Sequence, residues 1–392
     1  MPDIEKEKTN NHPAAFVEPM APKKTRLEEF WYLFSQNRLA IAGLAIFVLF
    51  FITAVVGLVL TSGQDPVFDP ALVRLQEKLR PPLSKPRMDL LLSHEVPTIG
   101  VYVMGTDDLG RDVFARMLQG AWVSLTVGFV AVGISVLVGI FMGGIAGYFG
   151  KSHIRLDHLL LFCLLSAAAV SLSIDRFFAG AVFAILFLAS VFLLFRPVIH
   201  TNTRGTSEWY RVLKMDTVSI DTLIMRIVDI MLCFPSFFLI LTVVALLPAS
   251  IYNIMIVIGL TSWMGTTRFV RAEFLSLREQ DFVTAARALG VGNFRIIFRH
   301  MMPNAIAPVL VSATIGIATA ILTEAGLSFL GFGVPPPHAT WGNILSDGKR
   351  FIFDAPWLTF IPGIAILIVV LCFNLFGEGL RDTLNPKLKE RH

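Results

Sequence analysis

Long uncharged apolar runs constrain this chain more than any other feature. Residues 39–60 hold no charged side chain, and neither do residues 121–149. About 20 helical residues are needed to cross the hydrocarbon of a bilayer, because each residue rises roughly 1.5 Å. Four further runs approach or exceed this length: 230–247, 251–267, 304–323 and 355–377. The chain is therefore predicted to be an all-α polytopic membrane protein.

Two more apolar stretches, 159–174 and 177–195, are separated only by Asp175 and Arg176. They predict a helical hairpin. A polar tail, residues 1–38, precedes the first run, whereas a cleavable signal peptide would place its apolar stretch near the start. We expect this tail to be cytoplasmic.

Charge supports the membrane assignment and orients it. Charged residues make up 16% of the chain, against about a quarter in soluble domains. A membrane barrel would show alternating segments of about 10 residues, which are not seen. Lys and Arg concentrate in alternate loops, which predicts cytoplasmic N- and C-termini. Because these cations are spread over several loops, no nucleic-acid partner is expected.

No catalytic or metal site is predicted. The three cysteines lie inside apolar runs without metal-ligand spacing. Gly150-Lys151-Ser152 resembles the end of a phosphate loop, but Ile145 stands where the motif requires glycine. We therefore expect a protein that is not an enzyme and that binds no cofactor itself.

A short amphipathic helix is predicted between two of the runs. Phe282, Ala285, Ala286 and Leu289 recur at helical spacing and form one apolar stripe, and Gly290 ends the helix. The pattern alone fits either a helix lying on lipid headgroups or a helix that docks into a groove of a soluble partner.

Other residues suggest roles in helix packing, in the translocation path and in the outer loop. The four-residue spacing of Gly139, Gly143 and Gly147 predicts close helix packing. Glu324 closes an apolar run, and Trp341 follows a stiff Pro-rich loop. Both are candidates for the translocation path or gate, and packing is the alternative for Glu324.

Asp229 is predicted to pair with Arg226 on one helix face. In the loop before residue 121, five charged side chains are interpreted as caps and ion pairs: Asp107, Asp108, Arg111, Asp112 and Arg116.

Residues 281–290 (DFVTAARALG) followed by 296–304 resemble the EAA loop of ABC-importer permeases, in the form found in the oligopeptide/dipeptide (peptide/nickel) family. Residues 105–116, 225–229 and 324–333, with Trp341-Gly342, resemble further segments of that family. The matches run from about residue 27 to 386 in the family's order. The chain is most similar to the second-permease (C-type) subunit.

The resemblance implies a type I permease bundle of six spans. It implies a homologous permease as heterodimer partner, two ATP-binding subunits that use ATP and Mg, and an extracytoplasmic solute-binding protein. The implied setting is a bacterial or archaeal cytoplasmic membrane, and the implied solutes are peptides or similar small molecules. The implied ATPase-coupling residues are Asp281, Phe282, Ala285, Ala286, Arg287, Leu289 and Gly290.

This sequence departs from the family pattern at two places. Thr284 replaces the acidic residue that names the EAA loop. Residues 151–216 resemble an insertion, so that eight spans are expected with the hairpin. The expected organisation is a tail (1–38), a first span with a long external loop (39–120), the transmembrane domain (121–380) with the coupling loop at 271–303, and a tail (381–392). A stand-alone secondary transporter is the alternative function.

Overall fold

The structure is a computed structural model that describes residues 25–384, except 64, 90, 93–95, 151–152 and 156–215. The predicted hairpin and most of the predicted insertion lie outside the described residues. Two short strands, β1 (His153–Arg155) and β2 (Asp216–Ser219), pair antiparallel at the two ends of that gap.

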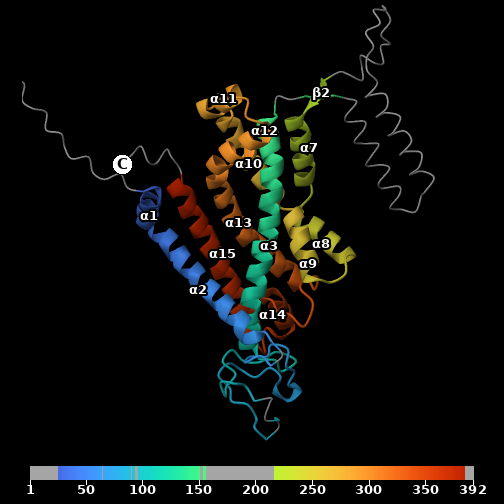
Figure 1. Cartoon of the computed structure of the whole chain (residues 1–392). Coiled ribbons are helices and arrows are strands. Elements are labelled where there is room, and N and C mark those ends of the chain that lie inside the picture. Colours follow the sequence, from blue (N-terminus) through green and yellow to red (C-terminus); the bar gives the residue numbers. More distant parts are fainter. Residues whose placement is uncertain are drawn as a thin grey trace, which may run out of the picture.

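The described part is a bundle of helices (Figure 1). A short helix, α1 (Arg26–Gln36), leads into α2 (Arg38–Thr61), whose first turn is capped by the Asn37 side chain. After a long loop with a 3-10 turn at Leu75–Glu77, α3 (Val113–Tyr148) begins at the cap residue Asp112. The remaining long helices are α13 (Met302–Phe329), which follows a π-helical turn at Ile296–Met301, and α15 (Trp357–Leu384).

Shorter helices cover one side and both ends of the bundle. On one side lie α7 (Ile220–Cys233), α8 (Ser236–Leu246) and α9 (Ile251–Leu260), whereas α10 (Trp263–Leu277) packs against both α3 and α13. One end carries α11 (Asp281–Ala288) and α12 (Asn293–Arg295). The opposite end carries α14 (Trp341–Gly348), a 3-10 turn at Lys349–Phe351 and the loop between α2 and α3 (Figure 1).

Four helices in the described part are long and apolar enough to cross a membrane: α2, α3, α13 and α15. They contain the predicted runs 39–60, 121–149 except its last residue, 304–323, and 355–377 except its first two residues. The all-α membrane fold is therefore confirmed, and these helices are longer than the uncharged runs that predicted them.

Two predicted spans are interrupted. The run 230–247 is not straight, because α7 and α8 meet at 83°. Pro235 begins α8 at this bend and has no N–H to continue α7. Taken together the bent pair gives a fifth possible span. The run 251–267 is divided where α9 ends. There the Thr261 and Ser262 hydroxyls donate to the carbonyls of Val257 and Ile258, both at 2.7 Å, and compete with helical bonding.

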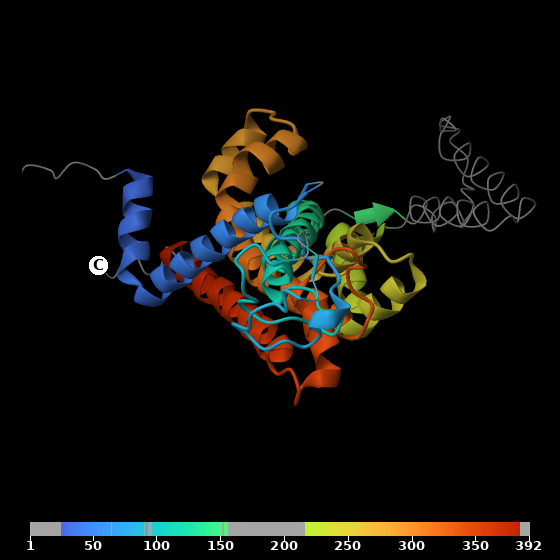
Figure 2. The ribbon, with the colours of Figure 1, turned by 90° about the horizontal axis from the view of Figure 1, so that it is seen from below.

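The core is organised around α3, which packs against α2, α9, α10 and α13 (Figures 1 and 2). The three spaced glycines of α3 lie against α10. A Cβ atom placed on Gly139 would lie 2.6 Å from the Thr266 Cβ, and one on Gly147 would lie 2.5 Å from the Phe274 Cβ. Only residues without a side chain fit such a close helix crossing.

Gly143 gives a direct test of this packing. A Cβ atom there would lie 2.6 Å from the Thr267 carbonyl oxygen and 2.8 Å from the Val270 Cβ, so the Gly143→Ala substitution forces α3 and α10 apart. Gly133, on the same helix, has no neighbouring atom within 4 Å of the same position. We expect Gly143→Ala to lower the apparent melting temperature of the purified protein. Gly133→Ala should leave it unchanged or raise it, because alanine favours helix. Equal effects would contradict the packing.

Candidate coupling surface and outer pocket

The α11 helix presents one face to solvent and buries another. Val283 is fully buried and Ala286 is 7% exposed, whereas Phe282 is 39% and Leu289 83% exposed. Gly290 follows with φ of +73°, a left-handed conformation that glycine adopts without strain. The predicted stripe is thus divided: Ala286 packs inward with Val283, and Phe282, Ala285 and Leu289 remain outside. The inward face packs near Ile296, Ile297 and Met301, which the sequence pattern did not reveal.

Polar contacts tie this helix to the ends of the long helices. The Arg287 guanidinium lies 4.9 Å from the centre of the Tyr148 ring, at the last residue of α3. The Tyr148 hydroxyl donates to Asn293 Oδ1 at 2.7 Å, and Arg278 reaches the Gly147 carbonyl at 3.4 Å. Arg287 therefore joins α11 to the end of α3, and the other two contacts join α12 and the end of α10 to the same place.

Two ion pairs connect α7 with α10. Arg268 donates to Asp229 at 2.7 Å, and the Arg271 Nη2 donates to Asp221 at 2.6 Å. The prediction that Asp229 pairs with Arg226 is therefore wrong. The reason is that α10 continues to Leu277, beyond the predicted end of its span, and so brings Arg268 beside α7.

At the opposite end, the charged loop before α3 forms the predicted caps and pairs. The Asp112 side chain accepts a hydrogen bond from the Phe114 N–H at 2.9 Å and caps α3. Asp107 is fully buried and accepts from Arg111 at 2.7 Å and from Arg116 at 2.5 Å. Both arginines also reach Asp347, near the end of α14, at 3.1 and 2.9 Å.

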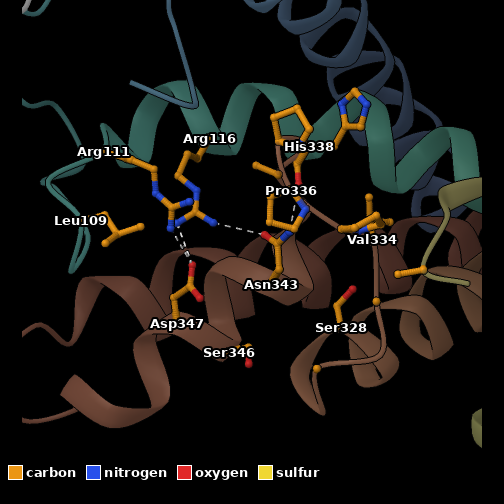
Figure 3. A pocket seen from close by; sticks show the side chains of 16 residues that line it. Leu109, Arg111, Arg116, Ser328, Val334, Pro336, His338, Asn343, Ser346 and Asp347 are labelled. Carbon is orange, nitrogen blue, oxygen red and sulfur yellow. Dashed lines mark hydrogen bonds and ion pairs between the residues drawn. The ribbon is translucent and has the colours of Figure 1, made fainter. Parts of the chain in front are cut away.

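A pocket of about 520 Å³ opens beside these ion pairs (Figure 3). Arg111, Arg116 and Asp347 line one side, and residues 333–339 line another. Its volume falls in the range of small-molecule sites, roughly 300–1,000 Å³. The sequence analysis missed Asp347 because its partners lie more than 200 positions earlier in the chain.

The two predicted path residues are both buried. Glu324 is fully buried; it accepts from the Ser328 hydroxyl at 2.6 Å and from the Ser124 hydroxyl at 3.3 Å. Trp341 is 1% exposed, and its Nε1 donates to the Met117 carbonyl at 3.2 Å. Neither side chain lines the pocket, but Ser328 does. Their role in a path or gate stays a prediction.

Acidic oxygens gather at the edge of the pocket. One carboxylate oxygen from each of Asp107, Asp108 and Asp347 lies within 4.8 Å of the others. Burial, and then the charges of Asp107 and Asp347, raise the pKa of Asp108. Since two of the three acids are already ion-paired to arginines, the expectation that no metal binds here is kept as a prediction.

Two family models match the chain. The model described as "Binding-protein-dependent transport system inner membrane component" matches residues 217–390. The model described as "N-terminal TM domain of oligopeptide transport permease C" matches residues 25–82. The first match contains α11 and the outer pocket's α14, and the second contains α1 and α2.

Several curated proteins are similar over most of their length. The dipeptide transport system permease protein DppC of Alkalihalophilus pseudofirmus is 36% identical over 354 residues, 90% of this chain and 88% of that protein. The di/tripeptide transport system permease protein DppC of Pseudomonas aeruginosa is 32% identical over 381 residues, covering 96% and 98%. The oligopeptide transport system permease protein OppC of Bacillus subtilis is 30% identical over 357 residues, covering 91% and 88%.

Proposed function

We propose, from the premise that the chain belongs to the family of binding-protein-dependent transport system inner membrane components, that it forms half of the membrane path of an ATP-driven importer of short peptides. As a member of this family it is a multi-pass permease subunit of an ABC importer rather than an enzyme. The similar proteins are named for dipeptide, di/tripeptide and oligopeptide transport, which supports peptides as the solute class.

The exposed face of α11 is the observation that supports a coupling role. Phe282 and Leu289 are apolar yet exposed, and Phe294 next to them is 74% exposed. Exposed apolar side chains on a short helix are typical of a helix that docks into a partner's groove. We infer that Asp281, Phe282, Ala285, Leu289 and Gly290 contact an ATP-binding subunit, while Ala286 and Arg287 fix the helix to the permease.

The proposed assembly contains three further kinds of subunit. A related permease completes the path, two ATP-binding subunits bind ATP and Mg, and a solute-binding protein delivers peptide from outside. Basic residues gather at the end that carries α11: Arg278, Arg287, Arg295, Arg299 and His300. This charge supports a cytoplasmic position for that end and for both termini, in the cytoplasmic membrane of a bacterium or archaeon.

A stand-alone secondary transporter is the competing function. Proton-coupled carriers hold several ionisable groups at membrane depth. Among the four described spanning helices, Glu324 is the buried acid, and Ser124 and Ser328 already bind it. This sparse set favours the importer.

The test is reconstitution. The chain is purified with its co-expressed partners, and uptake of radiolabelled trialanine into lipid vesicles is measured with and without ATP and the solute-binding protein. We expect uptake only with all subunits and ATP. Uptake by the chain alone, driven by a proton gradient, would overturn the proposal.

A further inference from the structure

The outer pocket lies at the end of the bundle opposite α11, beside α14 and the start of α3 (Figures 1 and 3). If that end faces the outside, a peptide released by the binding protein meets this pocket before it meets the buried helices. The pocket therefore raises the question of which part of a peptide its charges would bind. A role of this pocket in binding peptide rests on the proposed function.

The charges around the pocket do not balance. Three carboxylates, Asp107, Asp108 and Asp347, face two guanidinium groups, Arg111 and Arg116, which leaves one net negative charge. Lys349, the first residue after α14, is directed elsewhere, because its ammonium group donates to the Phe329 carbonyl at 3.3 Å. Burial, and after it the charges of Asp107 and Asp347, raise the pKa of Asp108.

Exposure decides which charge an incoming ligand meets. The Asp347 side chain is 32% exposed, whereas those of Arg111 and Arg116 are 17% and 4% exposed. Both arginines bind the same carboxylate oxygen of Asp347, Oδ2. The closest contact of each arginine with Asp347 therefore leaves the other oxygen, Oδ1, on the more exposed side chain. An ammonium group could bind Oδ1 without breaking either ion pair.

The rest of the pocket suits a small peptide. Consecutive prolines at 335–337 form a stiff apolar wall, and Asn343 and Ser346 add polar groups beside Asp347 (Figure 3). Ser328 lines the pocket and also donates to the buried Glu324. A ligand in the pocket would thus lie one side chain away from the polar network inside the bundle.

We propose that this pocket receives the amino-terminal end of a short peptide, with the α-ammonium group bound by the Asp347 carboxylate and the first side chain packed against the proline wall. The recognised chemistry is a free primary ammonium group next to a peptide unit. Blocking that group should weaken binding more than changing the peptide's far end.

The experiment uses the complete importer in lipid nanodiscs without its solute-binding protein, so that the selectivity of that protein does not enter. Binding of trialanine and of N-acetyl-trialanine is measured on the wild type and on the Asp347→Asn variant. A charge-assisted hydrogen bond at a partly exposed site predicts about tenfold weaker binding of trialanine by Asp347→Asn. N-acetyl-trialanine should bind the wild type about tenfold more weakly, and Asp347→Asn should not weaken it further.

Asp354→Asn is the matched control, because Asp354 is an exposed acid at the same end that does not line the pocket. It should bind trialanine like the wild type. Equal loss of affinity for both peptides in Asp347→Asn, or equal wild-type affinity for both, overturns the inference. The acetylation comparison on the wild type holds even if Asp347→Asn assembles poorly. Absence of trialanine uptake in the reconstitution experiment would instead contradict the proposed function.

Discussion

The Gly290→Asp substitution should abolish most ATP-driven uptake while leaving the permease inserted and folded. Gly290 has φ of +73°, a conformation that Asp and Asn tolerate better than other side chains. A Cβ atom added there meets no atom within 4 Å, so the permease itself loses little stability. The carboxylate, however, would enter the interface beside Leu289 without a partner, and burying an unpaired charge costs several kcal/mol. We expect uptake to fall roughly 100-fold.

Gly290→Asn separates charge from bulk, since it has nearly the same size and the same tolerance of positive φ. It should retain clearly more uptake than Gly290→Asp. The measurements are trialanine uptake by the reconstituted importer, the amount of permease in the membrane and the amount of ATP-binding subunit that co-purifies. Normal uptake by Gly290→Asp would show that α11 does not dock the ATPase. Loss of the permease from the membrane would show that the turn is needed for folding instead.

The positions of the membrane spans could be predicted from the sequence where apolarity alone determines where a helix begins and ends. The uncharged run 39–60 gave α2 to within one residue at each end, because Asn37 caps its start and the run itself fills the bilayer. The start of α3 was placed eight residues late. Arg116 was assigned to the loop before residue 121, yet it lies in α3 and is buried in ion pairs with Asp107 and Asp347. Charged residues end an apolar run without ending the helix when distant residues neutralise them.

Contacts between residues far apart in the sequence also limited the prediction of the coupling surface and the outer pocket. The coupling segment was found because its residues are contiguous, and a helical period is visible in eight residues. Which side of α11 is buried depends on Ile296, Ile297 and Met301 in the following turn, so the stripe was assigned partly to the wrong face. The outer pocket could not be found from local pattern, because Arg111 and Asp347 are brought together only by the packing of α14 against α3 and α15.

Removing the buried carboxylate of this outer network should have the largest effect on stability. Asp107 accepts four hydrogen bonds: from the backbone N–H groups of Leu109 and Arg111, both at 2.9 Å, and from the side chains of Arg111 and Arg116. In the Asp107→Ala variant these donors lose their acceptor in a buried site, and Arg116 keeps only Asp347 and a 3.4 Å contact to Asn343. Breaking a buried pair in this way costs about 3–5 kcal/mol.

Asp108 supplies the control, since it neighbours Asp107 but only part of its side chain is buried. Burial, and then the nearby charges of Asp107 and Asp347, raise its pKa, so that its charged form is disfavoured where it lies. The Asp108→Ala variant should therefore be as stable as the wild type or slightly more stable. For Asp107→Ala we expect an apparent melting temperature lower by roughly 5–10 °C and faster amide hydrogen exchange in residues 105–116. If the two variants melted alike, the ion pairs to Arg111 and Arg116 would not be what holds the loop on α3. The outer pocket would then lack the fixed charged wall on which the binding of a peptide ammonium group depends.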